Sequence, residues 1–148
     1  MSKKYEIHLK TKRVEFDLTI QQKYNILRGD SGTGKTRLAY LVQKAVMNKD
    51  IQLVCDLPVK PVTDVEVFFL YLEANIKAIY ILDDIVCNEL KGYNIGDLTK
   101  NNRGYFIFIT RRNIGGIDSN SADIYYMKRR HDIGSKTYYY LETKQVVA

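Results

Sequence analysis

The sequence predicts an α/β fold of three layers, in which a mostly parallel β-sheet is covered by helices on both faces. Three short apolar runs, at residues 24–27, 78–82 and 105–109, are typical of parallel strands buried on both faces. Helical patterns lie between such runs, as parallel strands require a crossover between them. An N-terminal β-hairpin and an added C-terminal strand complete the predicted sheet.

Length and composition predict one domain, residues 1–148, with an apolar content of 45% and a net charge of +6. The N-terminus has no apolar signal core, and polar residues interrupt the most apolar stretch, residues 65–82. We therefore expect a cytoplasmic protein that does not contact a membrane. Cys55 and Cys87 form no C-x-x-C pair, which predicts buried free thiols.

The predicted elements follow one another in a regular order. Residues 5–10 and 14–20 alternate apolar and polar side chains across a short polar link, which predicts the hairpin. Apolar residues recur at helical spacing from Leu38 to Val46, and residues 51–55 have strand character up to Pro58 and Pro61. The capping-box pattern at residues 63–66 predicts a helix from Asp64 to about Asn75. A polar stretch of helix or loop runs to Lys100, and residues 123–127 and 137–141 are the last strands.

A phosphate-loop pattern lies between the first core strand and the first helix. Gly29, Gly34, Lys35 and Thr36 fill the spacing G-x-x-x-x-G-K-[ST]. Glycines let backbone N–H groups turn toward a phosphate, and the positive end of the helix dipole points at the same group. Lys35 would contact the β- and γ-phosphates, and the Thr36 hydroxyl would hold Mg²⁺. We therefore predict that ATP and Mg²⁺ bind at Gly29, Asp30, Ser31, Gly32, Thr33, Gly34, Lys35 and Thr36.

A second motif follows the apolar run of residues 78–82, which ends in the carboxylates Asp83 and Asp84. Thr110 ends the run of residues 105–109 in the same way. Together with the phosphate loop, these residues resemble the P-loop NTPases of the additional-strand division, which holds the RecA, AAA+ and ABC-like ATPases. The chain is most similar to a small stand-alone ATPase of bacteria or mobile elements, because it lacks an L-S-G-G-Q signature and the helical lid of AAA+ proteins.

The resemblance implies a role for each of these residues. Asp83 would bind Mg²⁺ with Thr36, and Asp84 would act as the base that deprotonates the attacking water, with Glu89 as an alternative. Many such ATPases carry a glutamate where this chain has Asp84, so the resemblance implies slow hydrolysis. Thr110 matches the polar sensor position, and Lys35 completes the catalytic set.

The resemblance also implies an arginine from a neighbouring subunit, and therefore self-association with Mg·ATP. Arg111, Arg112, Arg129 and Arg130 are the candidates, and the tyrosines near the C-terminus could form the subunit interface. Two other functions stay open. One is a non-catalytic ATP-binding adaptor or inhibitor that acts through a protein or nucleic-acid partner. The other is a small-molecule or nucleotide kinase, in which Asp56 could bind the acceptor.

Overall fold

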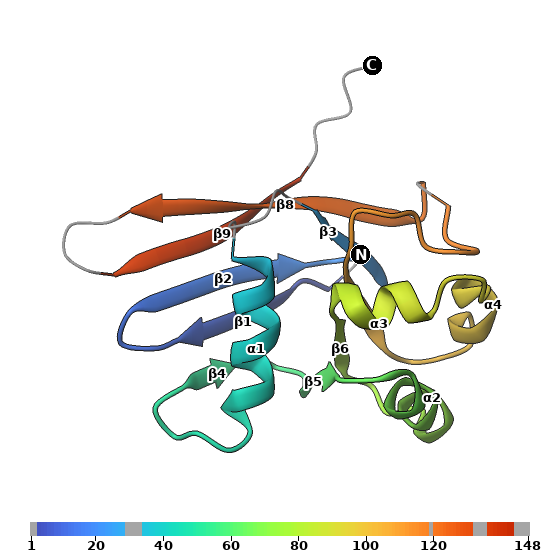
Figure 1. The fold of residues 1–148 in the computed structure, drawn as a ribbon, viewed down its shortest axis with the longest axis horizontal. Coiled ribbons are helices and arrows are strands. Elements are labelled where there is room, and N and C mark those ends of the chain that lie inside the picture. The colour runs from blue at the N-terminus through green and yellow to red at the C-terminus, as the bar shows by residue number, and fades with distance from the viewer. Residues whose placement is uncertain (1–2, 29–33, 119, 132–135, 144–148) are drawn as a thin grey trace.

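The computed structural model describes residues 3–28, 34–118, 120–131 and 136–143. Within these residues the chain forms one nine-stranded sheet and four helices, and the sheet order is β4-β1-β2-β9-β8-β3-β7-β6-β5 (Figure 1). The strands are β1 (Tyr5–Lys10), β2 (Val14–Ile20), β3 (Tyr24–Arg28), β4 (Gln52–Val54), β5 (Val59–Val62), β6 (Ile79–Leu82), β7 (Tyr105–Ile109), β8 (Ala122–His131) and β9 (Thr137–Thr143). The helices are α1 (Lys35–Ala45), α2 (Val65–Ala74), α3 (Asp84–Glu89) and α4 (Ile95–Thr99).

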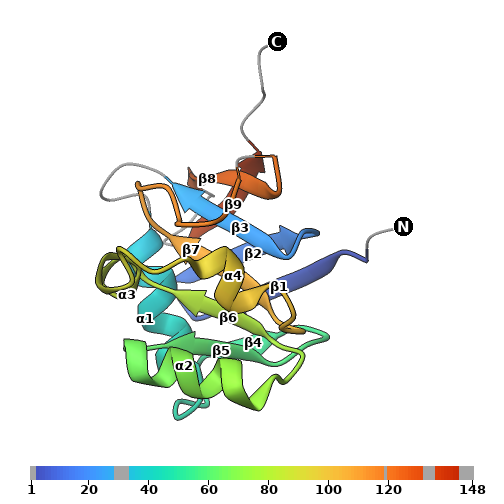
Figure 2. The same cartoon turned by 90° about the vertical axis from the view of Figure 1, so that its right-hand side faces the viewer.

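The strands from β8 to β5 pair in parallel, in the order β8-β3-β7-β6-β5. The side chains of β6 and of most of β7 are buried on both faces, which explains why their sequences are apolar throughout. Phe68 of α2, Val86 and Cys87 of α3, and Ile95 of α4 pack on one face of these strands. Figure 1 shows these helices to the right of the N-terminal hairpin, and Figure 2, viewed from that side, shows α3 and α4 in front of it.

The N-terminal hairpin forms as predicted, with β1 and β2 paired antiparallel from Tyr5 opposite Ile20 to Lys10 opposite Glu15. Its apolar side chains are buried and its polar side chains point away from the core. A second antiparallel hairpin joins β8 to β9, and β9 runs parallel to β2. The two hairpins therefore lie side by side in the sheet.

The prediction of a three-layer, mostly parallel sheet covered by helices on both faces is wrong. Besides the predicted β1–β2 hairpin, β1 pairs antiparallel with β4 and β8 pairs antiparallel with β9. The sheet also curls, so that the inner faces of β1, β2 and β9 pack into the same core as β6 and β7. Strands with alternating polarity need cover on one face only, and here α1 and the curled sheet provide that cover.

The region between α1 and α2 also differs from the prediction. Residues 51–55 contain only the short strand β4, which pairs with β1 at one edge of the sheet. The strand beside β6 is β5, in the segment that Pro58 and Pro61 marked as a turn. Proline is tolerated there because β5 is the other edge strand of the sheet.

The predicted helices form close to their expected bounds. The side chain of Asp64 accepts a hydrogen bond of 2.8 Å from the N–H of Val67, so Asp64 is the N-cap of α2. The polar stretch before residue 100 resolves into the short helices α3 and α4. In the described part of the chain, every helix is too short or too polar to cross a membrane.

Candidate functional site

The start of α1, the carboxylates of Asp83 and Asp84, and Thr110 meet at the carboxyl ends of neighbouring strands. Helix α1 follows β3, Asp83 follows β6 and Thr110 follows β7, and these three strands are parallel neighbours or next neighbours. The carboxyl ends of parallel strands are where ligands bind in open α/β sheets. A cavity of about 600 Å³ opens there, lined by Gly34, Lys35, Thr36, Arg37, Asp84, Ile109, Thr110, Arg111, Arg129 and Tyr139.

The start of α1 forms part of the cavity wall. Gly34 is the N-cap residue, with a φ of 94° that favours glycine, and its carbonyl accepts the N–H of Leu38 at 2.8 Å. Lys35 and Thr36 lie in the first turn of the helix, at the positive end of its dipole. The predicted ligands Gly29, Asp30, Ser31, Gly32 and Thr33 lie outside the described residues.

The cavity carries an excess of positive charge. Among the described residues that line it, Lys35, Arg37, Arg111 and Arg129 are cationic, and Asp84 is the one carboxylate. A concave site lined by charges of one sign concentrates ligands of the opposite sign. The cavity is therefore suited to a ligand with several negative charges.

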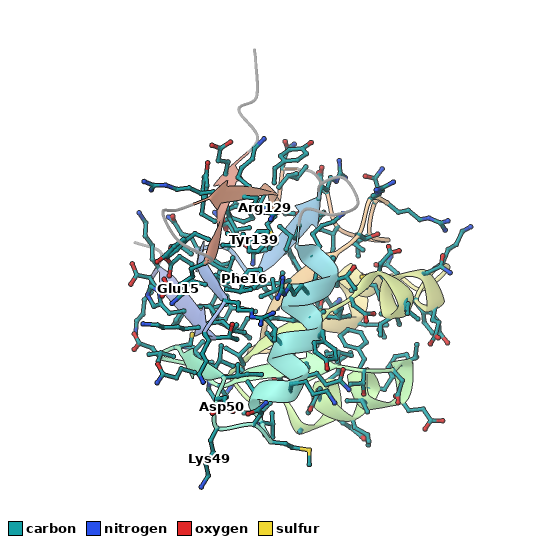
Figure 3. All side chains as sticks on the ribbon, turned by 60° about the vertical axis from the view of Figure 1, so that its left-hand side comes forward. Glu15, Phe16, Lys49, Asp50, Arg129 and Tyr139 are labelled. Carbon is teal, nitrogen blue, oxygen red and sulfur yellow. The ribbon has the colours of Figure 1, made fainter. Side chains whose placement is uncertain are left out.

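The hairpin of β8 and β9 supplies one wall of this cavity. Arg129 and Tyr139 are cross-strand partners. Figure 3 shows both residues beside the N-terminal end of α1. The Tyr139 ring stacks on Phe16, with ring centroids 4.7 Å apart. Its edge also lies against Gly34, because a Cβ atom built at Gly34 would stand 2.5 Å from Cε1 of Tyr139. The hairpin thus fixes one side of the phosphate-loop helix.

Asp83 makes a hydrogen bond that caps a helix and also lines a cavity of the site. Its Oδ1 accepts the N–H of Val86 at 3.1 Å, which caps α3. Asp83 also lines a second cavity of about 430 Å³, together with Thr36 and Asp84. Carboxylate and hydroxyl oxygens are the hard donors that Mg²⁺ prefers, so Thr36 and Asp83 fit a magnesium ion that is also held by phosphate oxygens.

Thr110 likewise has two roles. It is 3% exposed, and its Oγ1 accepts the N–H of Arg112 at 3.1 Å, as in an ordinary turn. It also lines the first cavity. Because a hydroxyl can donate one hydrogen bond while it accepts another, the turn leaves Thr110 able to donate toward a ligand.

Other residues that were candidates for the site are not among the described residues that line these two cavities. Glu89, the alternative base, and Asp56, the candidate acceptor residue of a kinase, are absent from both linings. Arg112 donates to Oδ1 of Asn88 at 2.9 Å instead, and Arg130 lies beside Tyr138 and Tyr140 at a different cavity. Arg111 and Arg129 reach the site within their own chain.

Both cysteines are free thiols, as predicted; Cys87 is buried, whereas Cys55 is only half-buried, which differs from the predicted burial of both. Burial raises the pKa of both thiols above the ordinary value. No cluster of three or more His, Cys, Asp or Glu side chains with metal-binding geometry occurs among the described residues.

Three residues that line the first cavity were not predicted as site residues from the sequence: Arg37, Ile109 and Tyr139. Arg37 follows the motif and could have been found from its position on the first turn of α1. Tyr139 could not, because its contact with Gly34 joins residues more than a hundred positions apart and depends on how the sheet curls. No protein-family model and no curated protein matches the chain.

Proposed function

We propose that the protein binds ATP at the first cavity, with Mg²⁺ between Thr36, which lines both cavities, and Asp83 of the second cavity, and hydrolyses ATP slowly. The observation that supports this most strongly is that one cavity gathers the phosphate-loop residues Lys35 and Thr36, the polar strand-end residue Thr110 and three arginines. The negative charges of a triphosphate would pair with these cations. The positive end of the dipole of the eleven-residue helix α1 would stabilise the same phosphates. The proposal also takes the chain to be a member of the P-loop NTPases, on the motifs that it contains.

Each residue would have a defined task. Lys35 pairs with the β- and γ-phosphates, while Arg111 and Arg129 offset the charge that spreads over the transferring phosphoryl group. Thr36 and Asp83 would hold Mg²⁺, which would neutralise part of the phosphate charge. Asp84 takes a proton from the attacking water, and the Thr110 hydroxyl donates toward the γ-phosphate or that water.

Asp84 should matter for turnover more than for binding, because a base acts mainly in the transition state. We expect Asp84→Asn to bind Mg·ATP with an affinity within about twofold of the wild type and to lose on the order of 10²-fold in the rate of phosphate release. Steady-state phosphate release and calorimetric titration measure the two quantities on the same preparation.

The adaptor function gives a different result in the same experiment. Tight binding of ATP by the wild type without any phosphate release would favour a non-catalytic adaptor or inhibitor over an ATPase. Unchanged release by Asp84→Asn would instead show that Asp84 is not the base. Glu89→Gln is the matched control, since Glu89 lines neither cavity and its replacement should leave release unchanged.

A further inference from the structure

The second cavity is separate from the first but shares a wall with it. Lys35, Thr36, Asp84 and Ile109 line both. The rest of the second cavity lies between one face of α1, the end of β5 and the start of α3. A molecule in the second cavity would therefore contact the same carboxylate, Asp84, that faces the triphosphate site.

The chemical character of the second cavity differs from that of the first. Beyond the shared wall its charged side chain is Asp83, whose charge Mg²⁺ would offset in the ATP complex, and among the described lining residues no arginine and no second lysine contributes. The walls are apolar, formed by Ala39, Pro61, Val62, Ile81, Ile85 and Ile109, and the hydrogen-bonding groups belong to Tyr40, Gln43 and Thr63. Such a lining disfavours an anion and suits an uncharged or cationic molecule with an apolar part.

The size of the second cavity exceeds what hydrolysis needs. Its volume is about 430 Å³, whereas a water molecule occupies about 30 Å³ in the liquid, so the attacking water and a Mg²⁺ ion at Thr36 and Asp83 would fill only part of it. Two large apolar side chains at the cavity, Tyr40 and Ile85, are 56% and 69% exposed. Apolar surface that faces a concave site of this volume is typical of small-molecule pockets.

The position of Asp84 indicates which part of the reaction this cavity serves. The base lies beside the atom that attacks the γ-phosphorus, on the side opposite the leaving ADP. The adenosine end of ATP extends from the α-phosphate and so away from the attacking atom. Asp84 lines both cavities, so the second cavity adjoins the base, and we place it on the acceptor side of the γ-phosphate.

We propose that the second cavity binds a small alcohol without negative charge, and that the alcohol's hydroxyl accepts the γ-phosphoryl group. This inference rests on the function proposed above. The hydroxyl oxygen forms a bond to the γ-phosphorus, the bond from that phosphorus to the β–γ bridging oxygen breaks, and ADP leaves. The hydroxyl proton passes to the Asp84 carboxylate. Slow hydrolysis is then the same transfer to water when no alcohol is present.

The test offers the full chain a panel of acceptors with Mg²⁺ and ATP labelled on the γ-phosphate. The panel consists of neutral nucleosides, neutral sugars and amino alcohols, with sugar phosphates as anionic comparators. Chromatography separates labelled inorganic phosphate from labelled phosphate esters. We expect one of the uncharged or cationic classes to become labelled, at a rate about tenfold or more above release to water, and the sugar phosphates to stay unlabelled.

A pair of matched variants tests the place of binding. Ile85→Trp narrows the second cavity and should raise the KM for the labelled alcohol about tenfold or more, with the affinity for Mg·ATP unchanged. Leu70→Trp is the control, because Leu70 is a helical aliphatic residue of similar exposure, 62%, that lines neither cavity. Both sites are exposed, so neither variant should disturb folding.

Three outcomes would overturn the inference, and each is distinct from failure of the proposed function. A wild type that binds Mg·ATP and labels only inorganic phosphate across the panel has no such acceptor. Labelling of the sugar phosphates in place of the uncharged alcohols would contradict the charge argument. An acceptor KM that is equal in Ile85→Trp and Leu70→Trp would place the acceptor outside the second cavity. Failure to bind Mg·ATP at all would instead refute the proposed function.

Discussion

Two polar residues of the candidate site hold the backbone in place as well as lining a cavity. Asp83 caps α3 through the N–H of Val86, and the Thr110 hydroxyl accepts the N–H of Arg112. Replacing either residue by alanine would therefore remove a structural hydrogen bond together with any contact to a ligand. Substitutions that keep the hydrogen bond are the informative ones.

Asp83→Asn separates the two roles of Asp83. Asparagine caps helices about as well as aspartate, so the free energy of unfolding should change by less than about 0.5 kcal/mol. The loss of the negative charge should lower the Mg²⁺-dependent part of ATP affinity by about tenfold or more. Urea unfolding and nucleotide titrations at several Mg²⁺ concentrations measure these effects. An affinity for Mg·ATP equal to that of the wild type would remove Asp83 from the metal site.

At the scale of the elements, the contact between the β8–β9 hairpin and α1 shapes the first cavity. Tyr139 lies between Phe16 of β2 and Gly34 at the start of α1, and its cross-strand partner Arg129 faces the same cavity. The position of Arg129 relative to Lys35 therefore depends on the packing of the Tyr139 ring. Arg129 and Tyr139 share one face of the hairpin because they are opposite each other in its register.

Gly34→Ala tests this contact, and Gly92→Ala is its control. Both glycines have left-handed backbone conformations, with φ of 94° and 96°, but a Cβ atom at Gly92 would meet nothing within 4 Å. In each variant the free energy of unfolding should fall by about 1–2 kcal/mol, because alanine is strained in the left-handed backbone conformation. We expect Gly34→Ala to lose a further 1–3 kcal/mol, roughly, because its Cβ collides with the Tyr139 ring. Equal losses in urea unfolding would show that the ring does not restrain Gly34.

The elements that local signals specify could be predicted from the sequence, and the pairing of distant strands could not. The alternation of residues 5–20 predicts the β1–β2 hairpin, and Asp64 marks the start of α2. Strand β5 was missed because Pro61 is a turn signal unless the strand lies at a sheet edge. Edge position is a property of the whole sheet, as is the β2–β9 pairing that curls it.

The same distinction holds for the site. Lys35, Thr36, Asp84 and Thr110 could be singled out because each belongs to a motif or follows a strand, and all four line the first cavity. Arg129 and Tyr139 line the same cavity because of the register in which β8 pairs with β9. From the sequence, Arg129 is only one of four candidates for an arginine supplied by a neighbouring subunit, because the sequence does not show this register.

At the scale of the whole molecule, the question is whether the arginines of the site come from the same chain or from a neighbouring subunit, because this decides whether hydrolysis requires self-association. The resemblance implies an arginine from a neighbouring subunit, whereas Arg111 and Arg129 line the cavity from the same chain. We therefore expect the hydrolysis rate per subunit to be independent of protein concentration. Rates over a hundredfold range of concentration, with light-scattering mass measured with and without a slowly hydrolysed ATP analogue, test this. A rate per subunit that rises as the mass doubles would restore the neighbouring subunit's role.

The measurement that tests the central claim most directly is a calorimetric titration of Mg·ATP into the wild type, Lys35→Ala and Lys44→Ala. Lys35 lines both cavities at the start of α1, while Lys44 lies exposed in its last turn, so the two variants remove the same charge from opposite ends of one helix. We expect Lys44→Ala to bind like the wild type and Lys35→Ala to bind at least about tenfold more weakly. Equal affinities in all three proteins, or no binding by the wild type, would contradict the claim that this cavity is an ATP site.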